Sequence, residues 1–441
     1  MSTNHAIQIL EAAIKSVQPA ALISKHVSLE DNILTVSDHT FDLDKLHNIL
    51  VIGAGKASAA MAAELERILG NKITAGFIVT KYEHSLPLNI IDCLEAGHPV
   101  PDQNSVLATK KMTAILENSS EKSLVICLIS GGASALLTDP PPGSTLEDLQ
   151  QLSRLLLESG ATIHEINTVR KHLSLIKGGQ LLRHTHKATV ISLILSDVIG
   201  DPLDVIASGP TVPDTSTFTD AWNILDKYLL IKKIPVSIKN WLQSGMEGVH
   251  PDTPKQGDPL FNNVFNHLIG TNSVALQAAS DKAKELGYHS SVITDRMMGE
   301  AKEKAVEFTE NCLHYRGPLP ACVLMGGETT VTLTGNGIGG RNQEFALAAL
   351  SVLGKHTIIA GKMPVILSAG TDGTDGPTEA DGAFADEAVI IQAKKLGLDP
   401  ELFLENNDSY HFFKNAGGHI ITGPTQTNVM DIVIGLIPAQ D

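Results

Sequence analysis

The chain is poor in aromatic residues, which make up 4% of its 441 residues, and it has only four cysteines. No two cysteines form a CxxC pair, which argues against a zinc site or a disulfide framework. Cys127 and Cys322 lie inside apolar runs, as buried inert thiols do. No apolar run approaches the ~18 residues of a membrane span, and no secretory signal is evident. We therefore expect a cytoplasmic protein with no membrane partner.

Positive charge is also scarce. Lysine and arginine number 33 against 49 aspartates and glutamates, which gives a formal net charge of −16. A broad negative field disfavours nucleic acid and anionic membranes as partners. A small anionic ligand stays open, because a local pocket of lysine, arginine and backbone N–H groups can override the global sign.

Several catalytic signatures are missing. There is no Walker A motif and no protein-kinase signature set. The G-x-S-x-G spacing of a nucleophile elbow is absent around Ser130, which argues against a covalent serine nucleophile. The acidic loop 368–386 fails the EF-hand spacing, since Thr374 and Gly376 fill the third and fifth positions counted from Asp372.

The chain is rich in short apolar runs that alternate with helical patterns. Continuous apolar strands separated by helices predict a doubly wound parallel sheet. A helical insertion is expected over 144–179, opened by the capping pair Ser144 and Glu147 or by Thr145 and Asp148. The predicted strands of this first sheet are 48–55, 73–80, 123–132 and 189–197.

A stretch dense in glycine and proline at 244–260 is interpreted as an inter-domain linker, after which the α/β alternation restarts. We predict an N-terminal Rossmann-like domain over 1–250 and a C-terminal α/β domain over 251–441. Ligands of such folds bind at the carboxyl ends of the strands, so we expect the site in the cleft between the domains.

The run "VIGAGKASAA" places Gly53, Gly55 and Lys56 between a strand and a helix. As a dinucleotide fingerprint it is weak, because Ser58 replaces the third glycine and Lys81 stands where an acidic residue would hold a ribose. Lys56 at a helix start suits a phosphate or a carboxylate. A tight turn with a solvated lysine is the alternative.

Two further runs follow predicted strands. "LISGGASALL" brings Ser130, Gly131, Gly132 and Ser134, small residues whose backbone N–H groups are open to an oxyanion. Asp197 ends the next strand, where a carboxylate is placed to take a proton from a substrate hydroxyl. The alternative for Asp197 is a helix N-cap.

A cationic cluster lies in "INTVRKHLSLIKGG", where Arg170, Lys171, His172 and Lys177 share one predicted helix. A solvated helix face is the usual explanation of such a run. Arg170 and Lys177 are kept as candidates for binding an anionic ligand.

The run "NGIGGRNQE" sets Gly339, Gly340 and Arg341 directly before an alanine-rich helix, an arrangement that makes sense if it faces a polyphosphate. The acidic loop supplies Asp372 and Asp375 as candidate Mg²⁺ ligands, because Mg²⁺ shared with phosphates needs only one or two carboxylates. A solvated acidic loop is the alternative. Phosphoryl transfer needs few parts beyond such cations, a base and the metal.

Together these runs resemble the type II glycerate 2-kinases, whose C-terminal part is called the MOFRL domain. The resemblance covers nearly the whole chain and is carried by "GAGKAS", "GHPVPD", "LISGGASAL", "INTVRKHLSLIKGG", "LSDVIGDPLDVIASGPT", "GGET", "GIGGRNQE", "GTDGTDGPT", "NDSY" and "TGPTQTNV". It implies phosphorylation of D-glycerate by ATP with Mg²⁺, typically giving 2-phosphoglycerate. It also implies catalytic importance for Lys56, Asp197 and Arg341, with Glu328 as a further binding candidate.

Two other functions remain open. Members of this family have also been labelled hydroxypyruvate reductases, which would oxidise NAD(P)H without ATP. A non-catalytic nucleotide or sugar-acid sensor would bind ATP but release no ADP. The oligomeric state is open as well, with a homodimer as one alternative.

Overall fold

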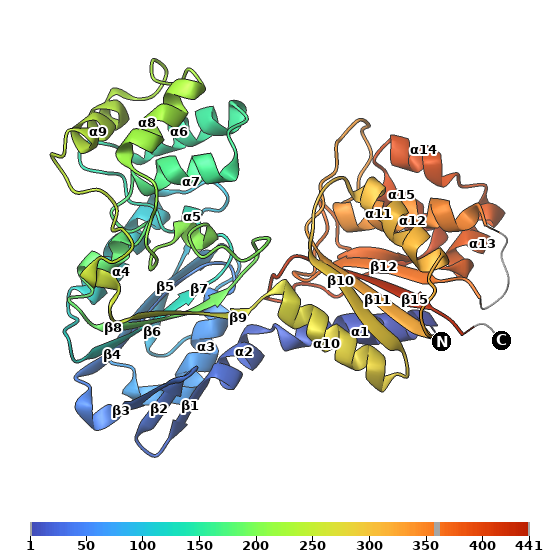
Figure 1. Ribbon diagram of the computed structural model, residues 1–441, viewed down its shortest axis with the longest axis horizontal. Helices are drawn as coiled ribbons and strands as arrows, with labels where there is room; N and C mark the ends of the chain where they lie inside the picture. The colour runs from blue at the N-terminus through green and yellow to red at the C-terminus, as the bar shows by residue number, and fades with distance from the viewer. Residues whose placement is uncertain (1, 357–361, 440–441) are drawn as a thin grey trace. The chain divides into compact units, whose positions relative to one another are not determined.

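The computed structural model describes residues 2–356 and 362–439, which belong to two compact units (Figure 1). One unit is Leu22–Ile269, and the other joins Met1–Ala21 to Gly270–Asp441. These bounds differ from the predicted domains 1–250 and 251–441 at two places. Helix α1 (Ser2–Ser16) packs on a helix of the unit that contains Gly270–Asp441. Strand β9 (Val264–Gly270), expected to open the second domain, extends the sheet of the first unit.

The unit Leu22–Ile269 is built on a six-stranded sheet of order β6-β5-β4-β7-β8-β9. Strands β6, β5, β4, β7 and β8 run parallel, which confirms the predicted doubly wound sheet. From β4 the chain adds strands first on one side and then, starting with β7, on the other. Doubly wound sheets bind ligands at such a switch point. The strands are β4 (Asn48–Ala54), β5 (Ala75–Lys81), β6 (Ile91–Ala96), β7 (Ser123–Ile129), β8 (Thr189–Leu195) and β9.

Helices of this unit divide into those beside the sheet and a separate helical group with its own apolar core (Figure 1). The first set is α2 (Pro19–His26), α3 (Ser58–Leu69), α4 (Gln103–Leu116) and α5 (Ala133–Leu136). The helical group is α6 (Leu146–Glu158), α7 (Ile163–Lys171), α8 (Phe218–Lys227) and α9 (Val236–Met246). Helix α6 begins at the predicted capping box of Thr145 and Asp148. Helix α7 ends before 179, because Ser174 and the N–H of Leu175 bond to Asp139 instead.

A small antiparallel sheet precedes β4 in the same unit. It is a meander of β1 (Val27–Glu30), β2 (Ile33–Val36) and β3 (His39–Asp42). Strands β2 and β3 are joined by a two-residue turn, Ser37 and Asp38, with Val36 paired to His39. Strand β1 lies against α3.

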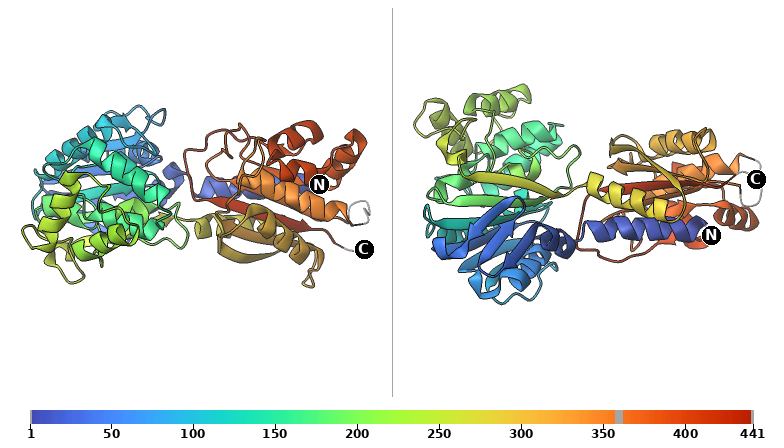
Figure 2. Two further views of the ribbon diagram at one scale, coloured as in Figure 1. Left: turned by 90° about the horizontal axis from the view of Figure 1, so that it is seen from above. Right: turned by 60° about the horizontal axis from the view of Figure 1, so that its bottom comes forward.

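The other unit has a mixed sheet of order β10-β11-β15-β12-β13-β14, visible in Figures 1 and 2. Only β10 and β11 pair in parallel, and the other neighbours pair antiparallel. Helix α12 (Arg341–Gly354) is buried along most of its length, as its alanine-rich sequence allows. The strands are β10 (His289–Met297), β11 (Ala321–Gly327), β12 (Val365–Gly370), β13 (Gly382–Ala385), β14 (His419–Ile420) and β15 (Asp431–Ile437).

The remaining helices of this unit cover its sheet. They are α1, α10 (Asn272–Glu285), α11 (Ala301–Leu313), α13 (Glu387–Leu396), α14 (Pro400–Glu405) and α15 (Ser409–Ala416). Among the described residues, no single helix is long and apolar enough to cross a membrane, and α1 with α2 passes that test only as a broken pair.

Candidate functional site

The turn that carries Lys56 is locked to the turn that follows β7. The N–H of Lys56 donates to the Gly131 carbonyl at 2.9 Å, and the Ala57 N–H donates to Ser130 Oγ at 3.0 Å. Gly55 has φ 130°, and a Cβ there would lie 2.2 Å from Ser130 Oγ. Only glycine fits that position. Ser130 is buried and holds this junction, while contact of its hydroxyl with a ligand stays a prediction.

Asp197 joins the same edge of the sheet from β8. A Cβ on Gly131 would lie 1.8 Å from Asp197 Oδ2, so the carboxylate rests directly on the glycine turn. No helix begins after Asp197, because the chain continues through turns, and the N-cap alternative is therefore wrong. The Lys56 side chain lies against Gly132, where a Cβ would be 3.5 Å from Lys56 Cγ. Lys56, the two glycines and Asp197 thus meet at the switch point, as the sequence predicted for the carboxyl ends of these strands.

His98 belongs to this group, and the sequence reasoning did not single it out. Its ring lies against Gly132, where a Cβ would be 2.9 Å from Cδ2. Burial, reinforced by the charges of Lys56 and Lys81, lowers the pKa of His98 to about 4. The imidazole is therefore neutral at neutral pH. The run "GHPVPD" that contains it was noted for its resemblance alone, because a lone histidine in a loop carries no spacing signal.

A cavity of about 280 Å³ opens beside these residues, lined by His98, Gly132, Ser134, Arg170 and Lys177 among others. Burial lowers the pKa of Arg170, but an arginine keeps its charge in proteins. In the described part of the chain, no carboxylate pairs with Arg170. A half-buried cation without a counter-ion favours an anionic ligand.

The other polar groups at this cavity differ in whether they already have a hydrogen-bond partner in the protein. Lys177 is buried, its ammonium donates to the Leu137 carbonyl, and burial lowers its pKa to about 8. Ser134 Oγ lies 2.9 Å from Ser208 Oγ. The N–H groups of Gly131 and Gly132 have no hydrogen-bond partner within the residues described. Arg170 and these two N–H groups are thus the donors that a ligand would meet unpaired.

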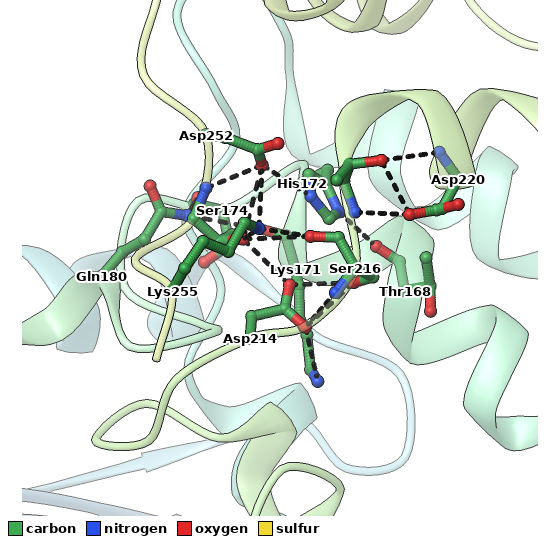
Figure 3. Close-up of polar contacts among 12 residues, drawn as sticks. Thr168, Lys171, His172, Ser174, Gln180, Asp214, Ser216, Asp220, Asp252 and Lys255 are labelled. Atoms are coloured by element: carbon green, nitrogen blue, oxygen red, sulfur yellow. Dashed lines mark hydrogen bonds and ion pairs between the residues drawn. The ribbon is translucent and has the colours of Figure 1, made fainter. Parts of the chain in front are cut away.

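The end of α7 that carries Arg170 is anchored by a buried polar cluster, shown in Figure 3. Lys171 Nζ lies 3.2 Å from Asp214 Oδ1, and His172 Nε2 lies 2.9 Å from Asp252 Oδ1. Lys171 is only 4% exposed and His172 only 1%. The interpretation of this cationic run as a solvated helix face is therefore wrong. Loops distant in sequence supply the carboxylates that allow these side chains to be buried.

His172 meets an acceptor at each ring nitrogen. Its Nδ1 lies 2.8 Å from the Thr168 carbonyl oxygen, and its Nε2 lies 2.9 Å from Asp252 Oδ1. Burial opposes the charge of Asp252, but His172 outweighs that penalty, and the pKa of Asp252 falls to about 2. The cluster fixes the last turn of α7 and with it the position of Arg170.

In the other unit, Arg341 is the first residue of α12 and is fully paired. Its Nε and Nη2 donate to the two oxygens of Asp431 at 2.6 and 2.9 Å, and its Nη1 donates to Glu328 Oε1 at 2.6 Å. Burial disfavours the charge, but these carboxylates outweigh it and raise the pKa of Arg341. Asp431, which the sequence reasoning missed, is completely buried at the start of β15. A role of Glu328 in binding a ligand stays a prediction.

Asp375 has a task other than the metal binding predicted for it. Its Oδ1 accepts the N–H of Asn342 at 3.0 Å, and its Oδ2 accepts the N–H and the side-chain amide of Gln343 at 2.9 and 3.0 Å. It therefore caps the first turn of α12, and burial raises its pKa to about 6. Since both oxygens are engaged, Asp375 is a poor Mg²⁺ ligand in this arrangement. Asp372 is less buried and uses Oδ1 to accept from Thr374.

A cavity of about 550 Å³ lies at this helix start, lined by Gly339, Gly340, Arg341 and Asp372 among others. Here too glycine is required by packing, since a Cβ on Gly340 would meet the Asp375 carboxylate at 2.2 Å. The N–H groups of Gly339, Gly340 and Arg341 have no partner among the described residues. The predicted anion-binding turn therefore has its donors in place, and ligand binding there stays a prediction.

These features define a class of α/β protein with glycine-rich turns at the strand ends of one unit and at a helix start of the other. Comparison with known proteins is more specific. A family model described as a domain of unknown function, DUF4147, matches residues 5–243, and the MOFRL family model matches residues 321–431. The D-glycerate 2-kinase of Thermotoga maritima is 41% identical over 98% of this chain and 97% of its own length. The chain therefore belongs to the glycerate kinase family.

A solved structure agrees with this assignment. The crystal structure of a glycerate kinase from Thermotoga maritima has a TM-score of 0.87 and 40% identity, covering 98% of this chain and 99% of that one. A putative hydroxypyruvate reductase of Agrobacterium vitis is 41% identical over 87% of this chain and 86% of its own length. The resemblance inferred from the motifs is thereby confirmed, as is the predicted α/β fold.

Proposed function

We propose that this protein is a D-glycerate 2-kinase, which transfers the γ-phosphoryl group of ATP to the 2-hydroxyl of D-glycerate. The observation that carries the proposal is the unpaired Arg170 in a cavity next to Lys56 and Asp197. Identity of 41% to the Thermotoga maritima D-glycerate 2-kinase over nearly the full length supports it.

Arg170 binds the carboxylate of the acceptor. A guanidinium and a carboxylate form two parallel charge-assisted hydrogen bonds, and the N–H groups of Gly131 and Gly132 add further donors. A volume of about 280 Å³ suits a three-carbon acid better than a nucleotide. Neutral His98 at the mouth of this cavity adds no charge that would compete for the carboxylate.

Asp197 and Lys56 serve the reacting atoms. The 2-hydroxyl oxygen attacks the γ-phosphorus, the bond from that phosphorus to the β–γ bridging oxygen breaks, and ADP leaves with the electron pair. Asp197 accepts the hydroxyl proton as general base. Lys56 stabilises the charge on the transferring group, as a preorganised cation does in phosphoryl transfer.

The α12 start binds phosphate oxygens of the donor. Arg341 is oriented there by Asp431 and Glu328, and the open N–H groups of Gly339 and Gly340 lie beside it. Asp372 fits Mg²⁺, a hard cation that takes carboxylate and phosphate oxygens. When bound, Mg²⁺ would neutralise phosphate charge. Asp375 supports this site by capping the helix rather than by coordinating the metal.

The reductase alternative has a named relative in its favour, the putative hydroxypyruvate reductase of Agrobacterium vitis. The turn at 53–58 and the end of the next strand argue against a nicotinamide-binding reductase. Ser58 is buried where the third fingerprint glycine would stand, and Lys81 ends β5 where an acidic ribose ligand is expected. The kinase is therefore the better supported function. We also propose a cytoplasmic location, consistent with four free cysteines, and a homodimer remains a hypothesis about its assembly.

The test is a coupled ADP-release assay with ATP, Mg²⁺ and D-glycerate, run beside a reductase assay with NADH or NADPH and hydroxypyruvate. We expect ADP release that depends on glycerate and no oxidation of either nicotinamide. Oxidation of NAD(P)H without ATP would establish the reductase. Binding of ATP with no ADP released for glycerate would establish the sensor.

A further inference from the structure

Three potential metal ligands gather where the β2–β3 hairpin meets the edge strand β9. Asp38 lies in the hairpin turn, His39 opens β3, and His267 lies on β9. One ligand atom from each lies within 4.8 Å of the other two. The function described above uses none of them.

The packing of the hairpin on β9 positions the two histidines. Side chains alternate between the faces of a strand, so Phe265 and His267 share one face of β9 while Asn266 bonds to Thr211 on the other. The His39 ring packs on Phe265 with centroids 4.0 Å apart and meets the His267 ring edge-on at 5.5 Å. Both imidazoles are therefore held between the hairpin and the sheet.

The distances fit an ion better than hydrogen bonds. Nε2 of His39 and Nε2 of His267 each lie 3.5 Å from the same oxygen, Asp38 Oδ1. Tetrahedral Zn²⁺ with nitrogen and oxygen ligands at about 2.0–2.2 Å separates them by roughly 3.3–3.6 Å. His267 Nε2 is buried and has no hydrogen-bond partner among the residues described. A buried nitrogen left unsatisfied is rare, and a cation would satisfy it.

We propose that Asp38, His39 and His267 form a binding site for a divalent transition-metal cation of the Zn²⁺ type, which links the β2–β3 hairpin to β9. Two imidazoles and one carboxylate suit Zn²⁺ and its neighbours rather than Mg²⁺, which prefers oxygen ligands. A fourth position stays available to water. Because none of the three ligands lines the cavity that contains Arg170, we assign the site a structural rather than a catalytic role.

The test is calorimetric titration of the full-length protein, with any affinity tag removed and after treatment with EDTA, at pH 7.5 with ZnCl₂ or MgCl₂. We expect one Zn²⁺ per chain and no competition from Mg²⁺. His267→Gln and Asp38→Asn should each weaken Zn²⁺ binding by at least about 10-fold, the smallest effect seen for groups that merely support a metal ligand. His164→Gln, an exposed histidine on α7, is the matched control and should leave binding unchanged.

Amide hydrogen exchange provides a second, independent measurement of metal binding. Zn²⁺ should slow amide hydrogen exchange in the hairpin 33–42 of the parent but not of Asp38→Asn, whose replaced side chain is exposed and not needed for folding. Absence of Zn²⁺ binding up to millimolar concentration would overturn the proposal. So would equal Zn²⁺ affinity in the parent and in a folded His267→Gln. Neither readout involves kinase turnover, so the proposed function stands or falls separately.

Discussion

Arg170 and Arg341 pose a comparison between the two units of the chain. Each arginine lies at a helix end and lines a cavity. Arg341 is paired with two carboxylates, whereas Arg170 has no carboxylate partner within the described residues. A guanidinium whose donors are spent on protein carboxylates is held as part of the scaffold. We propose that the unpaired guanidinium, which lines one cavity with Gly132, is the one that binds a ligand's carboxylate.

The comparison also assigns the chemistry. In the unit with Arg170, a lysine and an aspartate meet at the switch point of a parallel sheet. In the unit with Arg341, the carboxylates are engaged in the scaffold, with Asp375 capping α12 and Asp431 pairing with the arginine. Substitutions of Asp197 and Arg170 should therefore change catalysis and substrate affinity, whereas breaking the Arg341–Asp431 pair should mainly change stability.

The largest effect is expected for Asp197→Asn, which removes the proposed general base but keeps the size of the side chain. Loss of general-base catalysis should lower kcat by roughly 10²- to 10⁴-fold while KM for D-glycerate changes little. Steady-state kinetics and thermal melting on one preparation measure both consequences. A destabilised Asp197→Asn with full turnover per folded molecule would contradict the role as base.

Arg341→Gln should be next, with its effect on stability. It leaves the Asp431 carboxylate buried at 0% exposure without its cation, and breaking a buried pair costs about 3–5 kcal/mol of unfolding free energy. Chemical denaturation measures the loss. Adding Asp431→Asn should recover part of it, because the stranded charge is removed. If Arg341→Gln alone were as stable as the parent, the Arg341–Asp431 pair would not contribute to folding stability.

Arg170→Gln should have the opposite profile. Loss of charge-assisted hydrogen bonds to the acceptor, worth about 1.5–3 kcal/mol, should raise KM for D-glycerate by roughly 10- to 100-fold. Stability should change little, since no ion pair is broken. The kinetic and denaturation measurements are those made for Arg341→Gln. If both arginine variants lost the same stability, the distinction between scaffold and ligand site would fail.

The smallest expected effect is on the pH dependence of stability and involves His98. Its pKa in the folded protein, about 4, lies below the ordinary value of 6.5, so between these values the unfolded chain binds more protons. Stability contributed by neutral His98 is therefore present above pH 6.5 and lost as pH falls towards 4. His98→Gln should show a shallower fall of Tm over this range than the parent. Parallel Tm profiles would show that His98 is not buried as a neutral ring.

The sequence predicted what periodicity and strand ends determine. The apolar runs indicated the parallel sheet, and Lys56, Ser130 and Asp197 were each placed at the end of a predicted strand; the structure brings them to one edge. This follows because the carboxyl ends of parallel strands meet at the same edge. The capping box of Thr145 and Asp148 is equally local, with both residues within one turn.

What the sequence did not predict depends on partners far along the chain. Lys171 and His172 looked solvated because their bonding partners, Asp214 and Asp252, lie 43 and 80 residues away. The role of Asp375 as a helix cap was not predicted, because the residue it caps, Asn342, lies 33 residues earlier. The glycine- and proline-rich stretch before β9 was interpreted as a linker. Composition marks a loop, but it does not tell which sheet the next strand joins.

The central claim is phosphorylation of the 2-hydroxyl of D-glycerate, and the product tests it most directly. Phosphorus NMR of the reaction with ATP, Mg²⁺ and D-glycerate distinguishes the two esters by coupling to the protons of the esterified carbon. We expect a doublet, because the 2-phosphate is bonded to a carbon with a single proton. A triplet from the CH₂ of 3-phosphoglycerate, or no phosphate ester at all, would contradict the account.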